Sequence, residues 1–325
     1  MSAKYSRIIS TGSALPAARI TNEDLARRLA ADGIETSDEC IEARRFVNGT
    51  TETTTTLAAA AAQKALEGGG VDPKTIDLII VATTTPDQVF PSTAAAVQRL
   101  IGAAGCAAFD VQAVCAGFIY ALNAADAMLR AGPYQRALVI GAETMSRVID
   151  MKDRATCVLF GDGAGAVVLE ASAKPGILAA RMYADGSYDE NVLGLTARID
   201  HGELCGRPYI NMDGRQVFKL AVDGLTSSAQ EVAVLAGVDP QDVDVYIPHQ
   251  ANLRIMTMVA KKLGIPDERM IKTVSEQGNT SAASVPLALD EAVRSGKISD
   301  GSLVLLQAVG AGMAWGSAIV RWRSE

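Results

Sequence analysis

One segment of the chain occurs twice, 167 residues apart. Residues 70–80 read GVDPKTIDLII and residues 237–247 read GVDPQDVDVYI, with six of eleven positions identical. The separation is about half of the 325-residue length. Each copy follows an alanine-rich helical stretch and leads into a hydrophobic strand, so we infer a chain built from two related halves.

The two copies diverge directly after the shared strand. The first continues as VAT (81–83) and the second as PHQ (248–250), so one of only two histidines stands where the other copy has alanine. His249 therefore follows a strand, at the carboxyl end where open α/β sheets bind ligands. This position favours a functional role, with a structural histidine as the alternative. His201 has no such context and is interpreted as a surface residue.

The composition is that of a globular protein with an ample core, 49% hydrophobic and 21% charged. A net charge of −7 argues against a general nucleic-acid binder. The N-terminus lacks a signal-peptide core and no apolar run approaches the roughly 18–20 residues that span a bilayer. The five cysteines are scattered without a CxxC pair, which indicates a reducing, cytoplasmic setting and no metal site.

Helical and strand patterns alternate in the same order in both halves. Helices are expected at 25–31, 57–68, 93–103, 116–131, 221–236, 251–263 and 281–295. Strands are expected at 76–82, 107–114, 136–142, 166–170, 243–248, 270–274 and 302–309. This alternation predicts crossover connections and a mainly parallel sheet in each half, covered on both faces.

The halves are assigned to residues 1–172 and 173–325, and the lack of a low-complexity linker predicts one compact body. Residues 172–220 are expected to be irregular and to cap or line the site. The glycine-rich run 161–165 lacks the lysine of a phosphate-binding loop and precedes a strand. We interpret that run as a structural turn and expect no nucleotide cofactor.

Cys115 is the candidate nucleophile, because it stands where a predicted strand ends and a helix begins. Backbone N–H groups and the helix dipole converge at such a position and favour a thiolate. A small buried hydrophobic residue is the alternative, and it is the preferred interpretation of Cys40, Cys106 and Cys157.

Asn279 lies in a turn of small polar residues before the last predicted helix, where a plain helix cap is the alternative. With a shift of about three residues, the repeat makes Asn279 the counterpart of Cys115. A pseudo-twofold axis would then bring both strand ends together, with His249 beside them.

Four motifs resemble the β-ketoacyl-acyl carrier protein synthase III family, the thiolase-fold condensing enzymes that start fatty-acid chains. They are VCAGF (114–118), IPHQAN (247–252), GNTS (278–281) and GAGMAWG (310–316). The resemblance runs in order from about residue 5 to 323. It implies a five-layer αβαβα α/β fold with two pseudo-twofold related halves, and a homodimer.

The resemblance also implies a decarboxylating Claisen condensation. Cys115 would take the acyl group of an acyl-CoA primer, with acetyl-CoA as the first candidate, and malonyl-acyl carrier protein would lose carbon dioxide. The resulting carbanion would attack the acyl-cysteine and release a 3-oxoacyl product. His249 and Asn279 would donate hydrogen bonds to the malonyl thioester oxygen, and the backbone N–H groups of Cys115 and Ala311 would form a second oxyanion site. CoA enters as substrate, and no cofactor is implied.

Further residues acquire roles from the same resemblance. Arg44 is expected to reach a phosphate, Arg154 to contact the CoA nucleotide, and Phe90 to reach the acyl pocket of a partner subunit. The implied pocket-lining residues are Phe160, Met212, Phe218 and Asn252. The implied docking residues for the acidic carrier protein are Lys219, Arg254, Lys261 and Lys262, with a solvated helix face as the alternative.

Two departures from the family pattern fall at the expected CoA entrance. Cys40 stands where the family usually has a tryptophan that stacks on adenine. The family's Arg-Thr-Gly-Ile motif is replaced by RRFV (44–47). We therefore expect altered CoA recognition, and the primer stays open.

Three other functions are compatible with parts of the sequence. A specialised secondary-metabolite synthase, or one for another primer, would use the same triad. A cysteine hydrolase also has Cys, His and Asn in this order, and the spacing of 134 residues between Cys115 and His249 is in range. A catalytically silent module that binds the carrier protein is the third. Chain-elongating synthases with two catalytic histidines fit poorly, because His201 lies in the wrong context.

Overall fold

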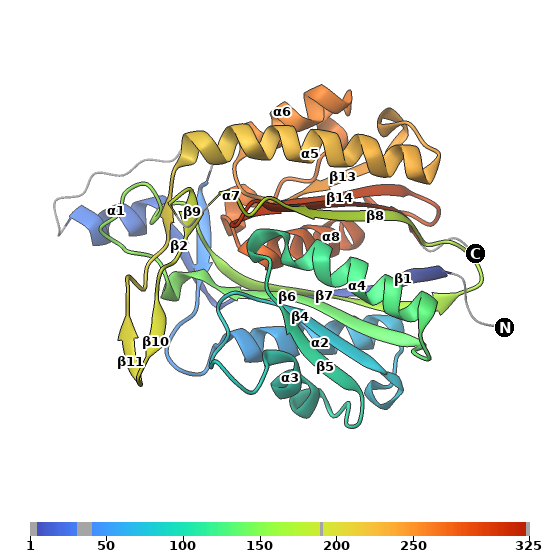
Figure 1. The fold of residues 1–325 in the computed structure, drawn as a ribbon, viewed down its shortest axis with the longest axis horizontal. Coiled ribbons are helices and arrows are strands. Elements are labelled where there is room, and N and C mark those ends of the chain that lie inside the picture. The colour runs from blue at the N-terminus through green and yellow to red at the C-terminus, as the bar shows by residue number, and fades with distance from the viewer. Residues whose placement is uncertain (1–4, 31–40, 189–190, 323–325) are drawn as a thin grey trace.

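The computed structural model describes residues 5–30, 41–188 and 191–322. Its two main sheets lie one above the other, with helices outside and between them (Figure 1). The first sheet has the order β1 (Tyr5–Ala14), β7 (Asp162–Ser172), β6 (Arg136–Thr144), β4 (Leu78–Ala82) and β5 (Ala107–Val111). The second has the order β13 (Val245–Pro248), β14 (Leu303–Gly310), β15 (Ala314–Arg321) and β8 (Ile177–Ala184).

The helices form three layers around these sheets (Figure 1). Those outside the first sheet are α2 (Thr54–Gly69) and α3 (Thr93–Ile101). Those between the sheets are α4 (Gly117–Ala131) and α8 (Ser284–Arg294), and those outside the second are α5 (Gly214–Ala236) and α6 (Leu253–Leu263). The expected five-layer αβαβα fold is confirmed. No helix in the described ranges is long and apolar enough to cross a membrane.

The smaller elements lie at one end of the body, around α1 (Asn22–Ala30). They are α7 (Val274–Gln277) and the short strands β2 (Ala18–Thr21), β3 (Ala43–Phe46), β9 (Leu193–Gly194), β10 (Arg198–Asp200), β11 (Glu203–Cys205) and β12 (Asn211–Met212). His201 lies in the turn between β10 and β11 with its side chain almost fully exposed, as a surface residue would.

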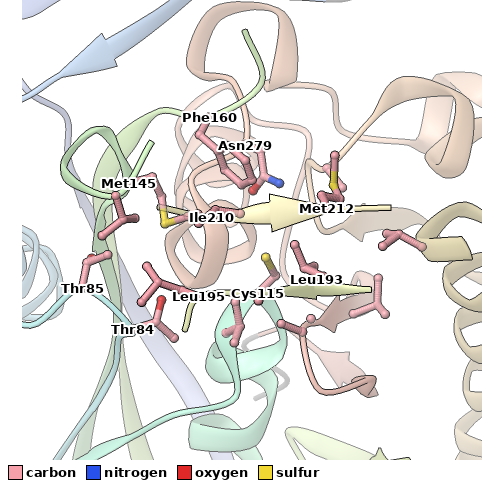
Figure 2. A pocket seen from close by; sticks show the side chains of 18 of the residues that line it. Thr84, Thr85, Cys115, Met145, Phe160, Leu193, Leu195, Ile210, Met212 and Asn279 are labelled. Carbon is pink, nitrogen blue, oxygen red and sulfur yellow. The ribbon is translucent and has the colours of Figure 1, made fainter. Parts of the chain in front are cut away.

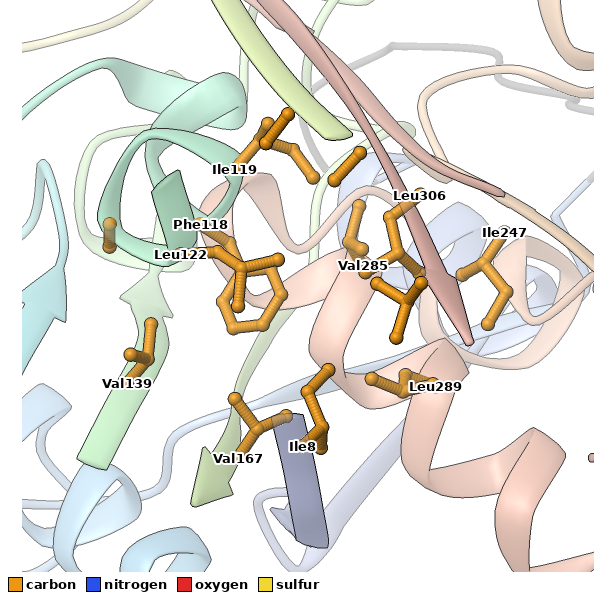
Figure 3. Close-up of a cluster of buried hydrophobic side chains, with 14 of the residues drawn as sticks. Ile8, Phe118, Ile119, Leu122, Val139, Val167, Ile247, Val285, Leu289 and Leu306 are labelled. Carbon is orange, nitrogen blue, oxygen red and sulfur yellow. The ribbon is translucent and has the colours of Figure 1, made fainter. Parts of the chain in front are cut away.

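The central core joins the two halves. Side chains of α4 and α8 meet those of both sheets there, and all of them are buried (Figure 3). Phe118 and Leu122 come from α4, Val285 and Leu289 from α8, and Ile247 from β13. Burial of apolar surface between the sheets stabilises their arrangement.

The duplicated segment adopts one conformation in both copies. Gly70 and Gly237 end the preceding helices in the left-handed region, with φ of 61° and 68°. Asp77 and Asp244 then each accept a hydrogen bond from the backbone N–H of the first residue of a neighbouring strand, β6 at 3.0 Å and β14 at 2.8 Å. The boundary placed at residue 172 falls between β7 and β8.

Three expectations about the sheets were wrong. Each sheet is mixed, because β1, β7, β8 and β15 pair antiparallel. The connection from β14 to β15 is only three residues long, too short for a crossover. The strand expected at 270–274 is reduced to one bridge between Tyr246 and Met270. The stretch 172–220 is not wholly irregular, since it contains β8 and the start of α5.

The glycine-rich run 161–165 is not a turn, because β7 begins at Asp162. A Cβ on Gly165 would lie 2.6 Å from the backbone nitrogen of Leu287. A Cβ on Gly163 would lie 3.0 Å from the side chains of Leu15 and Leu287. These glycines therefore permit the close approach of α8 to β7, a use of glycine in strands that resembles a turn signal in sequence.

Candidate active site

A cavity of about 760 Å³ lies where the carboxyl ends of strands from both halves meet. Cys115 of the first half and His249 and Asn279 of the second half all lie in its wall. Figure 2 shows Cys115 and Asn279 among apolar side chains of the cavity. Segments of the stretch 172–220, including Leu193 and Ile210, line it as expected.

The repeat extends into this site, residue by residue. Val114 and Ser281 are 167 positions apart, and both have a positive φ, 48° and 50°, which is uncommon for residues other than glycine. Each begins a short 3₁₀ turn that leads directly into α4 or α8. The counterpart of Cys115 is therefore Ala282, and the shift of three residues that equated it with Asn279 is wrong.

Cys115 is buried, with 4% of its surface exposed. Burial raises the pKa of its thiol to about 12, although a hydrogen bond from Ser281 acts in the opposite direction. The position at the start of α4 is as predicted, but the thiolate expected there is not favoured in the resting protein. Forming the nucleophile therefore requires a group that accepts its proton.

His249 is fixed by contacts on both its backbone and its ring. Its backbone N–H donates to the carbonyl of Gln307 at 2.7 Å, and its Nδ1 lies 2.5 Å from the Ser284 hydroxyl. Burial lowers the pKa of the imidazole to about 3, so the ring is neutral. When Ser284 donates to Nδ1, the proton of the ring is on Nε2, which is then a hydrogen-bond donor.

Asn279 is held by its own side chain and by its backbone. Its Oδ1 accepts from the N–H of Ser281 at 2.8 Å. Its backbone N–H donates to Leu159 at 2.8 Å and its carbonyl accepts from Gly161 at 3.0 Å. Because the carbonyl end of the amide is engaged, the Nδ2 end is the donor that this residue can offer a ligand.

The loop after β14 lies against the backbone of the nucleophile. A Cβ on Gly310 would be 2.8 Å from the nitrogen of Cys115 and 2.7 Å from the carbonyl oxygen of Ala113. Gly310 and Ala311 both line the cavity. Glycine is thus required at 310 for the approach, whereas the role of the Ala311 N–H as an oxyanion donor stays a prediction.

Sequence comparisons match this chain to one family. Residues 109–186 match the family described as 3-oxoacyl-[acyl-carrier-protein (ACP)] synthase III, and residues 234–322 match its C-terminal region. The crystal structure of 3-oxoacyl-[acyl-carrier-protein] synthase III from Aquifex aeolicus VF5 is 44% identical, with a TM-score of 0.87. The match covers 98% of this chain and 100% of that one. The chain belongs to the 3-oxoacyl-[acyl-carrier-protein] synthase III family.

Other solved structures extend this likeness. The synthase III from Pseudomonas aeruginosa PAO1 is 36% identical with a TM-score of 0.89, and 98% of each chain is covered. The priming β-ketosynthase of the R1128 polyketide biosynthetic pathway is 35% identical with a TM-score of 0.90, covering 99% of this chain and 97% of that one. The family thus includes priming enzymes of more than one pathway.

The residues assigned to substrate binding in this synthase III chain divide into two groups. Four line the cavity: Phe160, Met212, Phe218 and Asn252. Phe90 is 82% exposed and follows Val89, which does line the cavity. Arg154 is exposed and lies outside the cavity wall.

The assignment of Arg44 to a phosphate is a correction. Its side chain is fully buried, and its Nη2 donates to Oδ1 of Asn22 at 2.7 Å. A guanidinium in that position supports the packing around β3 and does not reach an entering ligand. Cys40, at the other expected departure from the family pattern, lies outside the described residues.

The four docking candidates are exposed on neighbouring helices, Lys219 on α5 and Arg254, Lys261 and Lys262 on α6. Lys219 follows Phe218 of the cavity wall, and the N–H of Arg254 donates to the side chain of Asn252. The basic face of these helices therefore borders the cavity. Lys262 also forms an exposed ion pair with Asp223 at 3.4 Å.

Three polar residues of the site were missed by sequence reasoning: Ser281, Ser284 and Glu143. The two serines stand in the small-residue run that contains Asn279, where caps and turns give the same pattern. Glu143 ends the hydrophobic strand β6, and an acidic residue at such a strand end is a detectable signal. No group of three metal-ligating side chains occurs among the residues described.

Proposed function

We propose that this enzyme condenses an acyl-CoA primer with malonyl-acyl carrier protein, with loss of carbon dioxide, through an acyl group on Cys115. The observation that supports these roles is one cavity wall that holds a thiol and two oriented donors. Ser284 engages His249 at Nδ1, and Ser281 engages Asn279 at Oδ1. The remaining N–H groups of both side chains are then available to the same ligand atom.

The chemistry follows from where negative charge develops. The Cys115 sulfur attacks the primer thioester, the carbon–sulfur bond to CoA breaks, and CoA leaves as the thiol. In the malonyl group the bond to the carboxylate then breaks, and its electron pair moves toward the thioester oxygen. Nε2–H of His249 and Nδ2–H of Asn279 stabilise that enolate, and such donors contribute about 3–4 kcal/mol each. Attack on the acyl-cysteine forms the new carbon–carbon bond and expels the Cys115 sulfur.

The cavity favours a primer larger than acetyl as a second candidate. Its wall is mainly apolar and its volume is about 760 Å³, more than an acetyl group fills. The likeness to a priming β-ketosynthase points the same way. We propose that Met145, Leu193 and Ile210, which lie in this wall, set the length of the primer.

A panel of acyl-CoA thioesters tests the reaction. Purified enzyme is incubated with each thioester, and the intact mass of the protein reports the acyl-enzyme. Malonyl-acyl carrier protein is then added, and we expect carbon dioxide and 3-oxoacyl carrier protein in equal amounts. Release of free fatty acid without the carrier substrate would instead indicate a hydrolase, and no acyl-enzyme at all would indicate a silent binding module.

We also propose that the enzyme is a homodimer in the cytoplasm. Phe90 and Val89 are 82% and 74% exposed, an uncommon state for two adjacent large apolar residues, and contact with a partner subunit would cover them. The edge strand β5 is only partly buried along its whole length. The described cysteines are all free thiols, which suits a reducing compartment.

Reversing the charge of the docking face is expected to weaken carrier binding alone. Arg254→Glu combined with Lys261→Glu should raise KM for malonyl-acyl carrier protein about tenfold and leave KM for acyl-CoA unchanged, because rim charges act on association with an oppositely charged partner. Steady-state kinetics with each substrate varied separately measure this.

A matched control reverses two exposed lysines at the opposite edge of the sheets. Lys74 precedes β4 and Lys297 precedes β14, so both lie away from the cavity. The control changes net charge by the same amount and should leave both KM values as they were. An equal rise of the carrier KM in both variants would return the face of α6 to a solvated surface without a partner.

A further inference from the structure

Behind the nucleophile lies a buried carboxylate that the condensation as written does not use. Glu143 ends β6 and is fully buried. It accepts hydrogen bonds from the backbone N–H groups of Thr84 and Thr85, both at 3.1 Å. The hydroxyls of the same two residues donate at 3.0 and 2.5 Å. Four donors from one loop hold the carboxylate in a single position.

Ser281 connects this carboxylate to the nucleophile. Its hydroxyl lies 3.1 Å from Oε1 of Glu143, and its side chain also hydrogen-bonds the Cys115 thiol. Ser281 is itself fixed, because its φ is 50° and its N–H donates to Asn279. A continuous chain of hydrogen bonds therefore runs from Cys115 through Ser281 to Glu143.

We propose that Glu143 is a positioning residue that accepts the proton of Cys115 through the hydroxyl of Ser281 and returns it at the end of each cycle. The proton of the thiol passes to Ser281 Oγ while the proton of that hydroxyl passes to Glu143 Oε1. The products are a thiolate and a carboxylic acid, so the net charge of the pair is unchanged. When condensation expels the sulfur as a thiolate, the same path in reverse restores the thiol. This proposal rests on Cys115 being the acyl carrier.

Electrostatics favour this shared charge. An ionised Glu143 raises the pKa of the Cys115 thiol, and burial raises the pKa of both groups. Two negative charges in one buried site would repel each other, whereas one charge that moves between the two groups avoids that cost. The proton leaves one buried acid and is held by another.

The other titratable groups of the cavity wall are poor acceptors. His249 has a pKa lowered to about 3 by burial, and its Nδ1 already contacts Ser284. Asp110 accepts from the N–H groups of Thr93 and Ala94 at 2.7 and 2.8 Å, so its carboxylate is engaged at the start of α3. Within the described wall, the hydrogen-bonded path from Cys115 leads to Glu143.

Alkylation of Cys115 by iodoacetamide tests the proposal without any substrate. Rates are measured from pH 6 to pH 10 by mass spectrometry of the peptide that contains Cys115. Glu143→Gln keeps the shape of the side chain but cannot take up the proton. We expect alkylation at pH 7 to slow at least about tenfold, and its midpoint to move to higher pH. Ser281→Ala should have the same effect, and the double variant should be no slower than either single variant.

The opposite sign overturns the proposal. If Glu143 were only an ionised structural carboxylate, its removal would take away a negative charge, and Cys115 would react faster. Additive losses in the double variant would also overturn it, since they would mean two independent effects. Ser281→Ala keeps every contact between Glu143 and the threonine loop, so it decides the question even if Glu143→Gln folds poorly.

A second buried pair supplies the matched control. Ser6 donates to Asp126 at 2.8 Å, and Asp126 is buried away from the cavity. Asp126→Asn should leave the alkylation profile of Cys115 unchanged. Wild-type enzyme that forms an acyl-enzyme while Glu143→Gln alkylates as fast as wild type would refute the relay and leave the acyl-transfer function standing.

Discussion

Cys115→Ala is expected to abolish the acyl-enzyme and to lower the rate of condensation by at least about a thousandfold. The acyl group has no other position in the cavity wall from which a covalent bond can hold it. Alanine removes the sulfur and keeps the Cβ, so the strained turn that begins at Val114 is preserved. Intact-protein mass spectrometry after incubation with acyl-CoA measures the covalent adduct, and product formation measures condensation.

Cys157→Ala is the control for this experiment. Cys157 is also buried, and burial likewise raises the pKa of its thiol, but it packs in a separate hydrophobic cluster around α1. The control should acylate like the wild type. Persistent labelling of Cys115→Ala at the stoichiometry of the wild type would show that another residue carries the acyl group.

His249→Ala and Asn279→Ala are each expected to lower malonyl decarboxylation by about 10²–10³-fold and to leave acyl transfer from CoA much less affected. Both side chains present donors where the enolate forms, whereas the acylation step places its developing charge near the backbone of Cys115. Single-turnover acylation followed by mass spectrometry, and release of labelled carbon dioxide, measure the two steps separately.

Two conservative variants separate these donors from their supports. Asn279→Asp keeps an oxygen for the N–H of Ser281 and loses the Nδ2 donor, so it should decarboxylate as poorly as Asn279→Ala. Ser284→Ala leaves the imidazole in place and removes the partner of Nδ1, so an intermediate loss of decarboxylation is expected. Equal losses in acylation and decarboxylation for all four variants would mean that the roles are assigned wrongly.

Much of this architecture could be predicted from the chain alone. The duplicated segment indicated two halves, and local periodicity located most helices and buried strands to within a few residues. Cys115, His249 and Asn279 were predicted because each follows a strand, which is a local property of sequence. The motifs around them then indicated the family. Such inferences succeed because turn chemistry and hydrophobic spacing act between residues that are close in the chain.

The tertiary structure decided what depends on distant residues. Only the packing of the halves shows that Ala282 is the counterpart of Cys115, that Arg44 is buried, and that Ser281 joins Cys115 to Glu143. Burial, which no local pattern reports, raises the pKa of the thiol against the expected effect of the helix terminus. The sequence by itself determined which groups stand at the strand ends. Their protonation and their partners were decided by folding, because desolvation and hydrogen bonding arise between segments far apart in the chain.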